Sequence, residues 1–390
     1  MIANRKLLRN ILLGSVFAFA AFAASAQARS FTVLHSFAGT PNDGSYDYNP
    51  VTFDAAGDIL GATNLGGTDN DGTIYKITPG KTETVLYSFT GGSEGYDPNA
   101  GVTLDPKSGN IYGTTTFGGS GSCRNGCGVL YELAADGTYT VLHTFAVSTD
   151  GEWPVGTLLR DKHGNLFGVA GGGGPNNGGT VFEYSAKGAF TVLHAFGSSG
   201  DGFQPVGNLM REAGNLYGVT NSGGTDQYGT VFKLAPDGTL TTLYSFTGGA
   251  DGGYPTGGID HDTAGNLYGA TNLAGNGTAP YGTVYKLAPD GTLTTLYTFA
   301  GGTDGGWPAG STLLAQGKVY GTTTWGGANE DGVVYEVDPV SGTETVLHSF
   351  AGDDGLIPES GLIKKGGRLY GTASGGGADN LGVVFSLKRK

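Results

Sequence analysis

Aromatic side chains that recur beside acidic residues are the part of this 390-residue chain best suited to bind a ligand. They stand one or two positions before a proline, at Tyr48, Tyr96, Trp153, Phe203, Tyr254 and Trp307. An Asp-Gly pair precedes four of them, and Trp325 stands before a Gly-Gly pair in a second loop series. Aromatic rings can cover the apolar face of a sugar while short polar side chains bond its hydroxyls. The alternative is that the rings only fill space between repeated units, because aromatic side chains usually serve packing.

Histidine, the usual general base, does not indicate catalysis here. His35, His143, His194 and His348 all lie in the pattern V-L-H-x-F, at a position that holds tyrosine in other copies. A position that accepts either ring predicts packing or hydrogen bonding. No G-x-S-x-G, H-E-x-x-H or phosphate-binding loop occurs. We therefore expect no catalytic residue and no cofactor, although the many carboxylates leave a glycosidase-type pair open.

The two cysteines, Cys123 and Cys127, lie in "CRNGC". In an exported chain this spacing favours a disulfide across one loop tip. Zinc would need two further ligands nearby, and the segment offers none. Calcium-loop spacing of acidic residues is also missing. The sequence therefore predicts a disulfide and no metal site.

The elements that position these residues come from a repeat. Segments resembling G-N-L-Y-G start at Gly57, Gly109, Gly164, Gly214, Gly265, Gly317 and Gly367, with spacings of 50 to 55 residues. Such periods indicate propellers or solenoids. The last copy, 367–390, has 24 residues, and the segment 31–56 supplies the 26 that complete it. A repeat divided between the two ends of a chain is typical of a closed ring, because pairing of the terminal strands covers an exposed sheet edge.

Each repeat contains four short runs of β-branched and aromatic residues separated by turn residues, as in 205–246. The sequence therefore predicts an all-β, seven-bladed β-propeller of four-stranded blades, closed by pairing of the N- and C-terminal strands in the last blade. We expect the first strands to begin at Pro50, Pro98, Pro154, Pro205, Pro255, Pro308 and Pro358. A glycine inside a strand, such as Gly218, is expected to allow close backbone approach.

The first 28 residues are typical of a secretory signal peptide. A basic start precedes the short apolar run 11–23, and small residues offer cleavage after Ala26 or Ala28. We expect residues 29–390 to form one domain that is exported to the periplasm or secreted. With 21 Lys and Arg against 34 Asp and Glu, the net charge is −13, which argues against nucleic acid and anionic membranes as partners. The expected state is a monomer.

The blocks G-N-L-Y-G, G-G, G-T-V-F-K-L, P-D-G-T and T-L-Y-S-F together resemble the GloVer (Gloeobacter–Verrucomicrobia type) tandem-repeat family of exported bacterial proteins. The resemblance covers essentially all of the chain after the leader and implies a β-propeller. It implies no established activity, so it transfers no catalytic residues.

These observations predict a non-catalytic binding or scaffold module. Its partner would be a glycan or an extracellular protein, held where the aromatic residues surround one mouth of the central channel. Two alternatives stay open. One is a carbohydrate-active or lyase-type propeller enzyme, and the other is a structural protein of the cell envelope.

Overall fold

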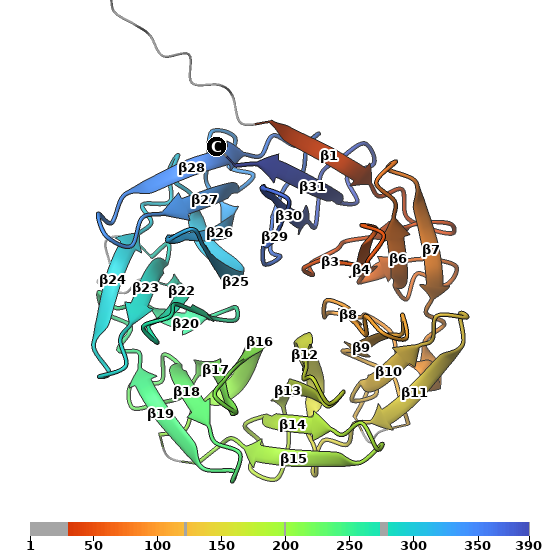
Figure 1. The fold of residues 1–390 in the computed structure, drawn as a ribbon, viewed down its shortest axis with the longest axis horizontal. Coiled ribbons are helices and arrows are strands. Elements are labelled where there is room, and N and C mark those ends of the chain that lie inside the picture. Colours follow the sequence, from red (N-terminus) through yellow and green to blue (C-terminus); the bar gives the residue numbers. More distant parts are fainter. Residues whose placement is uncertain (1–29, 121–122, 199, 274–279, 390) are drawn as a thin grey trace, which may run out of the picture.

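The computed structural model of the chain describes residues 30–120, 123–198, 200–273 and 280–389. Antiparallel sheets stand in a ring around a central axis (Figure 1) and form seven blades of four strands. This confirms the predicted propeller. The predicted leader, residues 1–28, lies outside the described residues. Within the described ranges, no helix is both long enough and apolar enough to cross a membrane.

Each blade runs from an inner first strand to an outer fourth strand (Figure 1). Blades one to three comprise β3 (Thr52–Phe53), β4 (Ile59–Thr63), β6 (Thr73–Ile77) and β7 (Glu83–Ser88); β8 (Thr103–Leu104), β9 (Ile111–Thr115), β10 (Val129–Leu133) and β11 (Tyr139–Thr144); and β12 (Glu152–Arg160), β13 (Leu166–Gly172), β14 (Thr180–Tyr184) and β15 (Phe190–Ala195).

Blades four to six follow the same order. They comprise β16 (Phe203–Glu212), β17 (Asn215–Ser222), β18 (Thr230–Leu234) and β19 (Leu240–Ser245); β20 (Gly253–Pro255) with β21 (Asp260–His261), β22 (Leu267–Leu273), β23 (Thr283–Leu287) and β24 (Leu293–Thr298); and β25 (Gly306–Ala315), β26 (Lys318–Trp325), β27 (Val333–Val337) and β28 (Glu344–Ser349). In blade five, β20 and β21 both pair with β22, so together they take the place of one inner strand.

Blade seven is built from both ends of the chain. It comprises β29 (Ile363–Lys365), β30 (Arg368–Ala373), β31 (Val383–Lys388) and, on the outside, β1 (Phe31–Ser36). β1 pairs antiparallel with β31, with Phe31 opposite Leu387. Beyond this ladder, Lys388 N–H donates to Ser30 O at 3.0 Å. The predicted closure of the ring by the terminal strands is confirmed.

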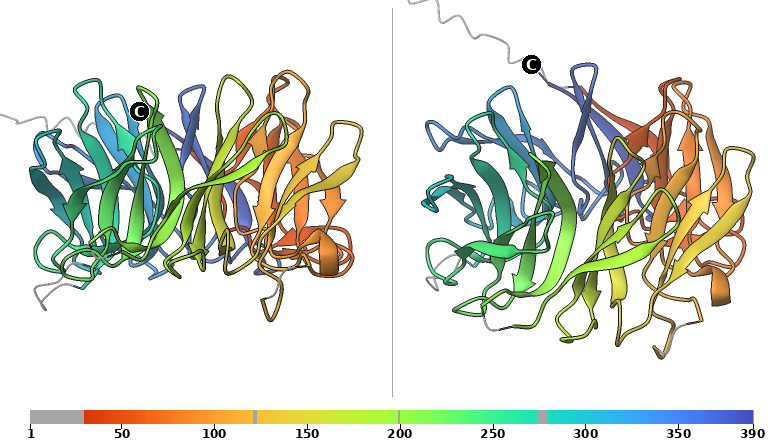
Figure 2. Two further views of the ribbon diagram at one scale, coloured as in Figure 1. Left: turned by 90° about the horizontal axis from the view of Figure 1, so that it is seen from below. Right: turned by 60° about the horizontal axis from the view of Figure 1, so that its bottom comes forward.

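The two faces of the ring carry different connections. Figure 2 (left) shows narrow turns on one face and, on the other, longer loops together with the short helix η1 (Gly92–Glu94). The longer loops enter the inner strands or join the second strands to the third. The two kinds are hydrogen-bonded to each other, as where Tyr96 N–H donates to Phe117 O at 3.1 Å. In blade one, β2 (Gly44–Ser45) pairs with β5 (Leu65–Gly66) in the same way. Both kinds of loop therefore share one face, as predicted.

The inner strand of blade one starts elsewhere than expected. In every blade a residue with positive φ ends the entry loop and donates its N–H to a loop of the preceding blade. In six blades a proline follows this residue, which is Asp97, Trp153, Gln204, Tyr254, Trp307 or Ile357. In blade one it is Tyr46, whose N–H donates to Leu381 O at 2.8 Å, and Asp47 follows it. The inner strands themselves begin at Thr52, Thr103, Glu152, Phe203, Gly253, Gly306 and Ile363, so none begins at its predicted proline. In blade one the prediction also chose the wrong residue, because Asp47 and not Pro50 stands at the position of the other prolines. Pro50 suggested the wrong alignment of this blade because proline is tolerated at several positions along a sheet edge. At such positions no neighbouring strand requires a hydrogen bond from a backbone N–H.

The glycine of each second strand makes room for a ring of the third strand. Gly218 pairs with Phe232, and a Cβ added at Gly218 would lie 2.7 Å from Phe232 Cζ and 3.0 Å from Leu209 Cδ2. The expected close approach at Gly218 is therefore made by buried side chains and not by another backbone. The same pairing recurs in the other blades, at Gly61 and Tyr75, Gly113 and Tyr131, Gly168 and Phe182, Gly269 and Tyr285, Gly321 and Tyr335, and Gly371 and Phe385.

Gly218→Val is expected to lower the free energy of unfolding by about 1–3 kcal/mol, because the added methyl groups must displace a fully packed ring. Urea denaturation followed by tryptophan fluorescence measures the change. Gly80→Ala is the matched control, since Gly80 lies in an exposed turn and an added Cβ meets nothing nearer than 3.6 Å. A loss no larger than that of the control would contradict the packing role.

Candidate ligand site in the central channel

A cavity of about 760 Å³ lies inside the ring and is lined by residues from all seven blades. Its side chains are mostly small or neutral and polar. They include Tyr48, Asn49, Asn99, Asn208, Thr256, Asn272, Trp307, Ser311, Thr324 and Glu359. Glu359 is the one charged residue among the described residues that line it. A cavity of this size and character fits a neutral or cationic polar ligand.

Glycine residues allow neighbouring inner strands to approach each other closely around the cavity. A Cβ added at Gly257 would lie 1.8 Å from Gly310 O, and one added at Gly156 would lie 2.3 Å from Gly207 O. The inner strands can therefore approach only because these positions carry no side chain. Much of the wall is backbone as a result, so the few large side chains that reach the cavity are the candidates for ligand contact.

The predicted aromatic residues occupy three different positions in the blades. Trp153, Tyr254 and Trp307 are the positive-φ residues before the prolines. Tyr96 and Phe203 stand one residue earlier, and Tyr48 stands two residues after the positive-φ Tyr46, in the segment that leads into β3. Of the seven predicted residues, Tyr48 and Trp307 line the described part of the cavity. The sequence pattern thus identified the loops that enter the inner strands. It treated as equivalent, however, residues that occupy different positions in these loops and have different neighbours.

Trp307 forms the centre of an aromatic cluster at the junction of blades five and six. Its ring stacks on that of Trp325, with the ring centroids 5.2 Å apart and an angle of 24°. Tyr281, from the preceding blade, lies 6.2 Å from Trp307 and 5.9 Å from Trp325. Trp307 remains 38 % exposed. The partly exposed indole of Trp307 therefore lies beside the cavity and packs against the rings of Trp325 and Tyr281.

Tyr96, Trp153 and Tyr254 pack against residues of their own or a neighbouring blade. Tyr96 lies 5.4 Å from Phe117, and Tyr254 lies 5.4 Å from Tyr228. The ring of Trp153 covers Gly172, where an added Cβ would lie 3.1 Å from it, although Trp153 is 41 % exposed. For these residues the packing interpretation accounts for the contacts observed.

Polar groups gather beside Tyr48, where blades seven, one and two meet. Burial, followed by the charges of Glu359 and Asp97, raises the pKa of the Tyr48 phenol. Burial also raises the pKa values of Glu359 and Asp97. Asn64 Nδ2 donates to Asp97 Oδ1 at 2.6 Å. Carboxyl groups with raised pKa values in a cavity are candidates for proton transfer or for binding a cation.

Asp47 is a buried group that sequence reasoning missed. It occupies the place of the proline in the other blades and is completely buried. Tyr75 Oη donates to its carboxylate at 2.6 Å, and Asn49 N–H donates at 2.8 Å. Burial raises its pKa to about 7 despite these two hydrogen bonds. A signal was present, because Pro50 stands only seven residues before Gly57, whereas the other prolines stand nine to eleven residues before theirs.

The histidines hold neighbouring loops in place, as predicted. His35, His143 and His194 each contact an aspartate of the loop that follows, at Asp43, Asp150 and Asp201. Tyr87, Tyr244 and Tyr297 donate to Glu94, Asp251 and Asp304 in the same way, and His348 lies 3.0 Å from Asp354. Burial alone would raise the pKa of Asp150, but hydrogen bonds from His143, Thr149 and Ala146 outweigh it and lower the pKa. All seven positions thus have one structural role.

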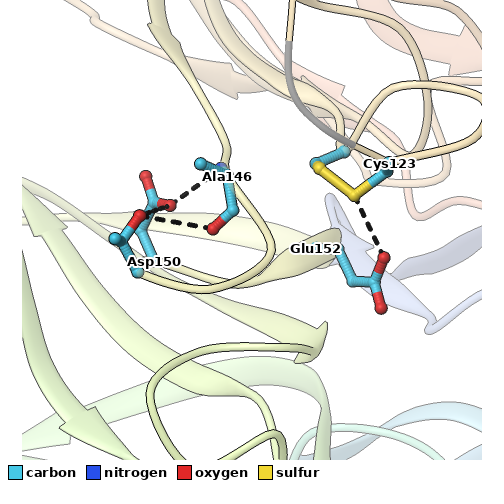
Figure 3. Close-up of a disulfide and its surroundings, with 6 residues drawn as sticks. Cys123, Ala146, Asp150 and Glu152 are labelled. Carbon is cyan, nitrogen blue, oxygen red and sulfur yellow. Dashed lines mark hydrogen bonds between the residues drawn. A yellow bond between two sulfur atoms is a disulfide. The ribbon is translucent and has the colours of Figure 1, made fainter.

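Cys123 and Cys127 form a disulfide, with their Cα atoms 5.2 Å apart. Figure 3 shows it beside Glu152 and near the loop in which Ala146 N–H donates to Asp150 Oδ1 at 2.8 Å. Cys123 Sγ lies 3.1 Å from Glu152 Oε2, and burial raises the pKa of that carboxyl. The disulfide closes a loop on the face where the inner strands begin, as the sequence predicted.

Comparison with known proteins identifies a sequence family. A family model described as the Gloeobacter/Verrucomicrobia repeat matches residues 13–227 and 204–390. No curated protein matches the chain by sequence.

Solved structures share the fold at low identity. Virginiamycin B lyase from Staphylococcus aureus is 14 % identical with a TM-score of 0.58, and the alignment covers 93 % of this chain and all of that one. An oligogalacturonate lyase in complex with manganese is 12 % identical with a TM-score of 0.56, covering 93 % of this chain and 96 % of that one. The extracellular domain of a putative one-component system from B. thetaiotaomicron is 13 % identical with a TM-score of 0.57, covering 92 % and 41 %. At these identities the likeness concerns the fold alone.

Proposed function

The chain belongs to the Gloeobacter/Verrucomicrobia repeat family, and from this premise we propose that it is an exported, monomeric binding module that holds a glycan in its central channel. The protein acts without catalysis, and its ligand is neutral or cationic. The net charge of −13 argues against nucleic acid and anionic lipid as partners. The leader-like residues 1–28 and the disulfide support export to the periplasm or beyond the cell.

One observation carries the proposal. The half-exposed Trp307 indole and the Tyr48 phenol line the same cavity as the amides of Asn99, Asn208 and Asn272. Aromatic rings provide rigid area for stacking at little cost in conformational entropy, and amides both donate to and accept from hydroxyl groups. A carbohydrate presents apolar ring faces and many hydroxyls, so it matches both kinds of side chain.

Replacement of Trp307 and Tyr48 by alanine is expected to weaken glycan binding at least tenfold, because both ring contacts are lost. A glycan array first selects the ligand, and calorimetric titration of the soluble oligosaccharide then measures the dissociation constant. Trp153→Ala is the matched control, since Trp153 occupies the same position in its blade as Trp307 and is equally exposed. Equal affinity of the double variant and the wild-type protein would contradict the channel site. The absence of any glycan ligand would favour the structural-envelope alternative.

A second candidate function is a lyase-type or hydrolytic enzyme that acts on a polysaccharide. It is favoured by the juxtaposition of Tyr48 and Glu359, both of which line the cavity and have raised pKa values. A carboxyl group whose pKa is raised by burial is a candidate for a general acid. Turnover of a polysaccharide panel by the wild-type protein, lost in Glu359→Gln, would establish this function and overturn the non-catalytic proposal.

A further inference from the structure

A histidine and two carboxylates meet where the last blade joins the first. His35 lies on β1, Asp43 lies on the loop that follows it, and Glu83 is the first residue of β7. One ligand atom from each of the three lies within 4.8 Å of the other two. His35 Nε2 is 2.9 Å from Asp43 Oδ2. The cluster therefore joins the N-terminal strand of the chain to the outer strand of blade one.

Glu83 departs from the packing used at other blade junctions. At its position in blade seven, Phe31 stacks on His348 with ring centroids 3.7 Å apart. In blade three, Phe190 stacks on His143 at the same distance. In blade one, the Glu83 carboxylate occupies the position at which those blades have an aromatic ring stacked on the histidine of the preceding blade. This exchange removes a stacking contact and provides a metal ligand in its place.

One oxygen of the Glu83 carboxylate, Oε1, is buried without a hydrogen-bond partner among the described residues. Asp43 places a second carboxylate oxygen within 4.8 Å of a Glu83 oxygen. A shielded carboxylate oxygen without a donor is costly, and a second carboxylate beside it adds repulsion. A cation bound between the two carboxylates would remove both costs.

We propose that His35, Asp43 and Glu83 bind a divalent first-row transition metal ion, with Zn²⁺ preferred, and that this ion fastens the N-terminal strand to the first blade. One imidazole nitrogen and two carboxylate oxygens suit Zn²⁺, with water completing the coordination, whereas Mg²⁺ and Ca²⁺ prefer ligands that are all oxygen. On binding, the metal replaces the proton between His35 Nε2 and Asp43 Oδ2, and that proton is released to solvent. The site is independent of the channel and of the proposed glycan function.

The molecule contains its own control for this site. Glu344 occupies the position of Glu83 in blade six, and its Oε1 is likewise buried without a hydrogen-bond partner among the described residues. Burial, a hydrogen bond to Asp304 and the charges of Asp304 and Glu344 raise the pKa of Tyr297, and burial followed by the charge of Asp304 raises the pKa of Glu344. Tyr297 replaces the imidazole there, and a neutral phenol is a poor metal ligand. Zn²⁺ should therefore bind at Glu83 and not at Glu344.

Titration of the purified protein with ZnCl₂ tests the proposal, using protein without a histidine tag and stripped of metal by chelation. One equivalent of Zn²⁺ is expected to bind and to raise the melting temperature by more than Ca²⁺ or Mg²⁺ does at the same concentration. Glu83→Phe and His35→Tyr each introduce the residue that other blades carry at that position, so both should fold. Each is expected to weaken Zn²⁺ binding at least tenfold, while Glu344→Gln leaves it unchanged.

Three results would overturn the assignment. They are failure of Zn²⁺ to bind the wild-type protein, equal binding by the wild-type protein and Glu83→Phe, or stabilisation by Ca²⁺ as large as that by Zn²⁺. Melting of each variant without metal separates a folding defect from a loss of ligands, because a variant that melts like the metal-free wild-type protein is folded.

Discussion

Deletion of residues 29–38 is expected to abolish cooperative unfolding, because these residues supply the outer strand of the last blade. β1 covers the edge of β31 along its whole length. Phe31 stacks on His348 of blade six, and Phe37 is fully buried 5.3 Å from Tyr75 of blade one. Loss of the buried Phe37 ring costs roughly 3–5 kcal/mol, and loss of the partly buried Phe31 ring and of the strand ladder adds to this cost. That sum is comparable to the entire stability of an ordinary domain.

Urea denaturation and size-exclusion chromatography measure the effect of this deletion. The deleted protein should unfold over a broad range and associate through the exposed edge of β31. Removal of residues 1–28 alone is the control and should leave a sharp transition. A synthetic peptide of residues 29–38, added in excess, is expected to restore part of the cooperativity. A deleted protein that stays monomeric and unfolds as sharply as the control would show that the ring does not depend on terminal pairing.

The closure was predictable because it depends on the length of a repeat and not on any single contact. The residues missing after Lys390 are those present before Gly57, and a closed ring makes the two halves neighbours in space. The family resemblance rests on the same spaced blocks and is confirmed by the matching family model. Blade number and strand order then follow, since each repeat contributes four strands of similar composition.

The candidate site was less predictable, because it depends on register within a strand. A shift of one residue turns a side chain to the opposite face of a sheet. Tyr96 and Trp153 both precede a proline closely, but only Trp153 has the positive φ that ends the entry loop. Trp307 and Trp153 share one position, and only Trp307 reaches the cavity. Which of two equivalent rings faces a cavity is decided by tertiary packing that a repeat pattern does not encode.

The missed groups share a physical cause. Asp47 stands where the other six blades carry proline, and Glu83 stands where five of the other six carry an aromatic or aliphatic residue, so an average of the repeats conceals both. Asp47 contacts Tyr75, and Glu83 lies beside His35; both partners are distant in the sequence, so the sequence alone shows no reason for these contacts. Both have pKa values raised to about 7. A buried titratable group is thus found by looking for a residue that differs from its equivalents in the other blades, and not from the repeat pattern itself.

Asp47→Asn is expected to stabilise the protein at pH 8 and to leave its stability nearly unchanged at pH 4. The Asp47 carboxyl has a pKa of about 7 when folded, against an ordinary value of 3.8. Between these pH values the folded protein keeps the proton and the unfolded chain loses it. The free energy of unfolding therefore falls as the pH rises from about 4 to about 7, by up to about 4 kcal/mol for a shift of this size. Asparagine cannot ionise, so the variant avoids that loss.

Urea denaturation at intervals between pH 4 and pH 8 measures this difference. Asparagine retains an oxygen that can accept from Asn49 N–H and an amide that can donate to Tyr75 Oη, so both hydrogen bonds to residue 47 can persist. Glu83 and Glu344 also have pKa values raised to about 7. As the pH rises, they lower the free energy of unfolding of the wild-type protein and of Asp47→Asn by the same amount. Their contribution therefore cancels in the difference between the two proteins. Asp379→Asn, at an exposed loop position, is the control and should follow the wild-type profile. A constant difference between Asp47→Asn and the wild-type protein across this range would mean that Asp47 is already ionised inside the folded blade, with Tyr75 and Asn49 supplying enough hydrogen bonding to hold a buried charge.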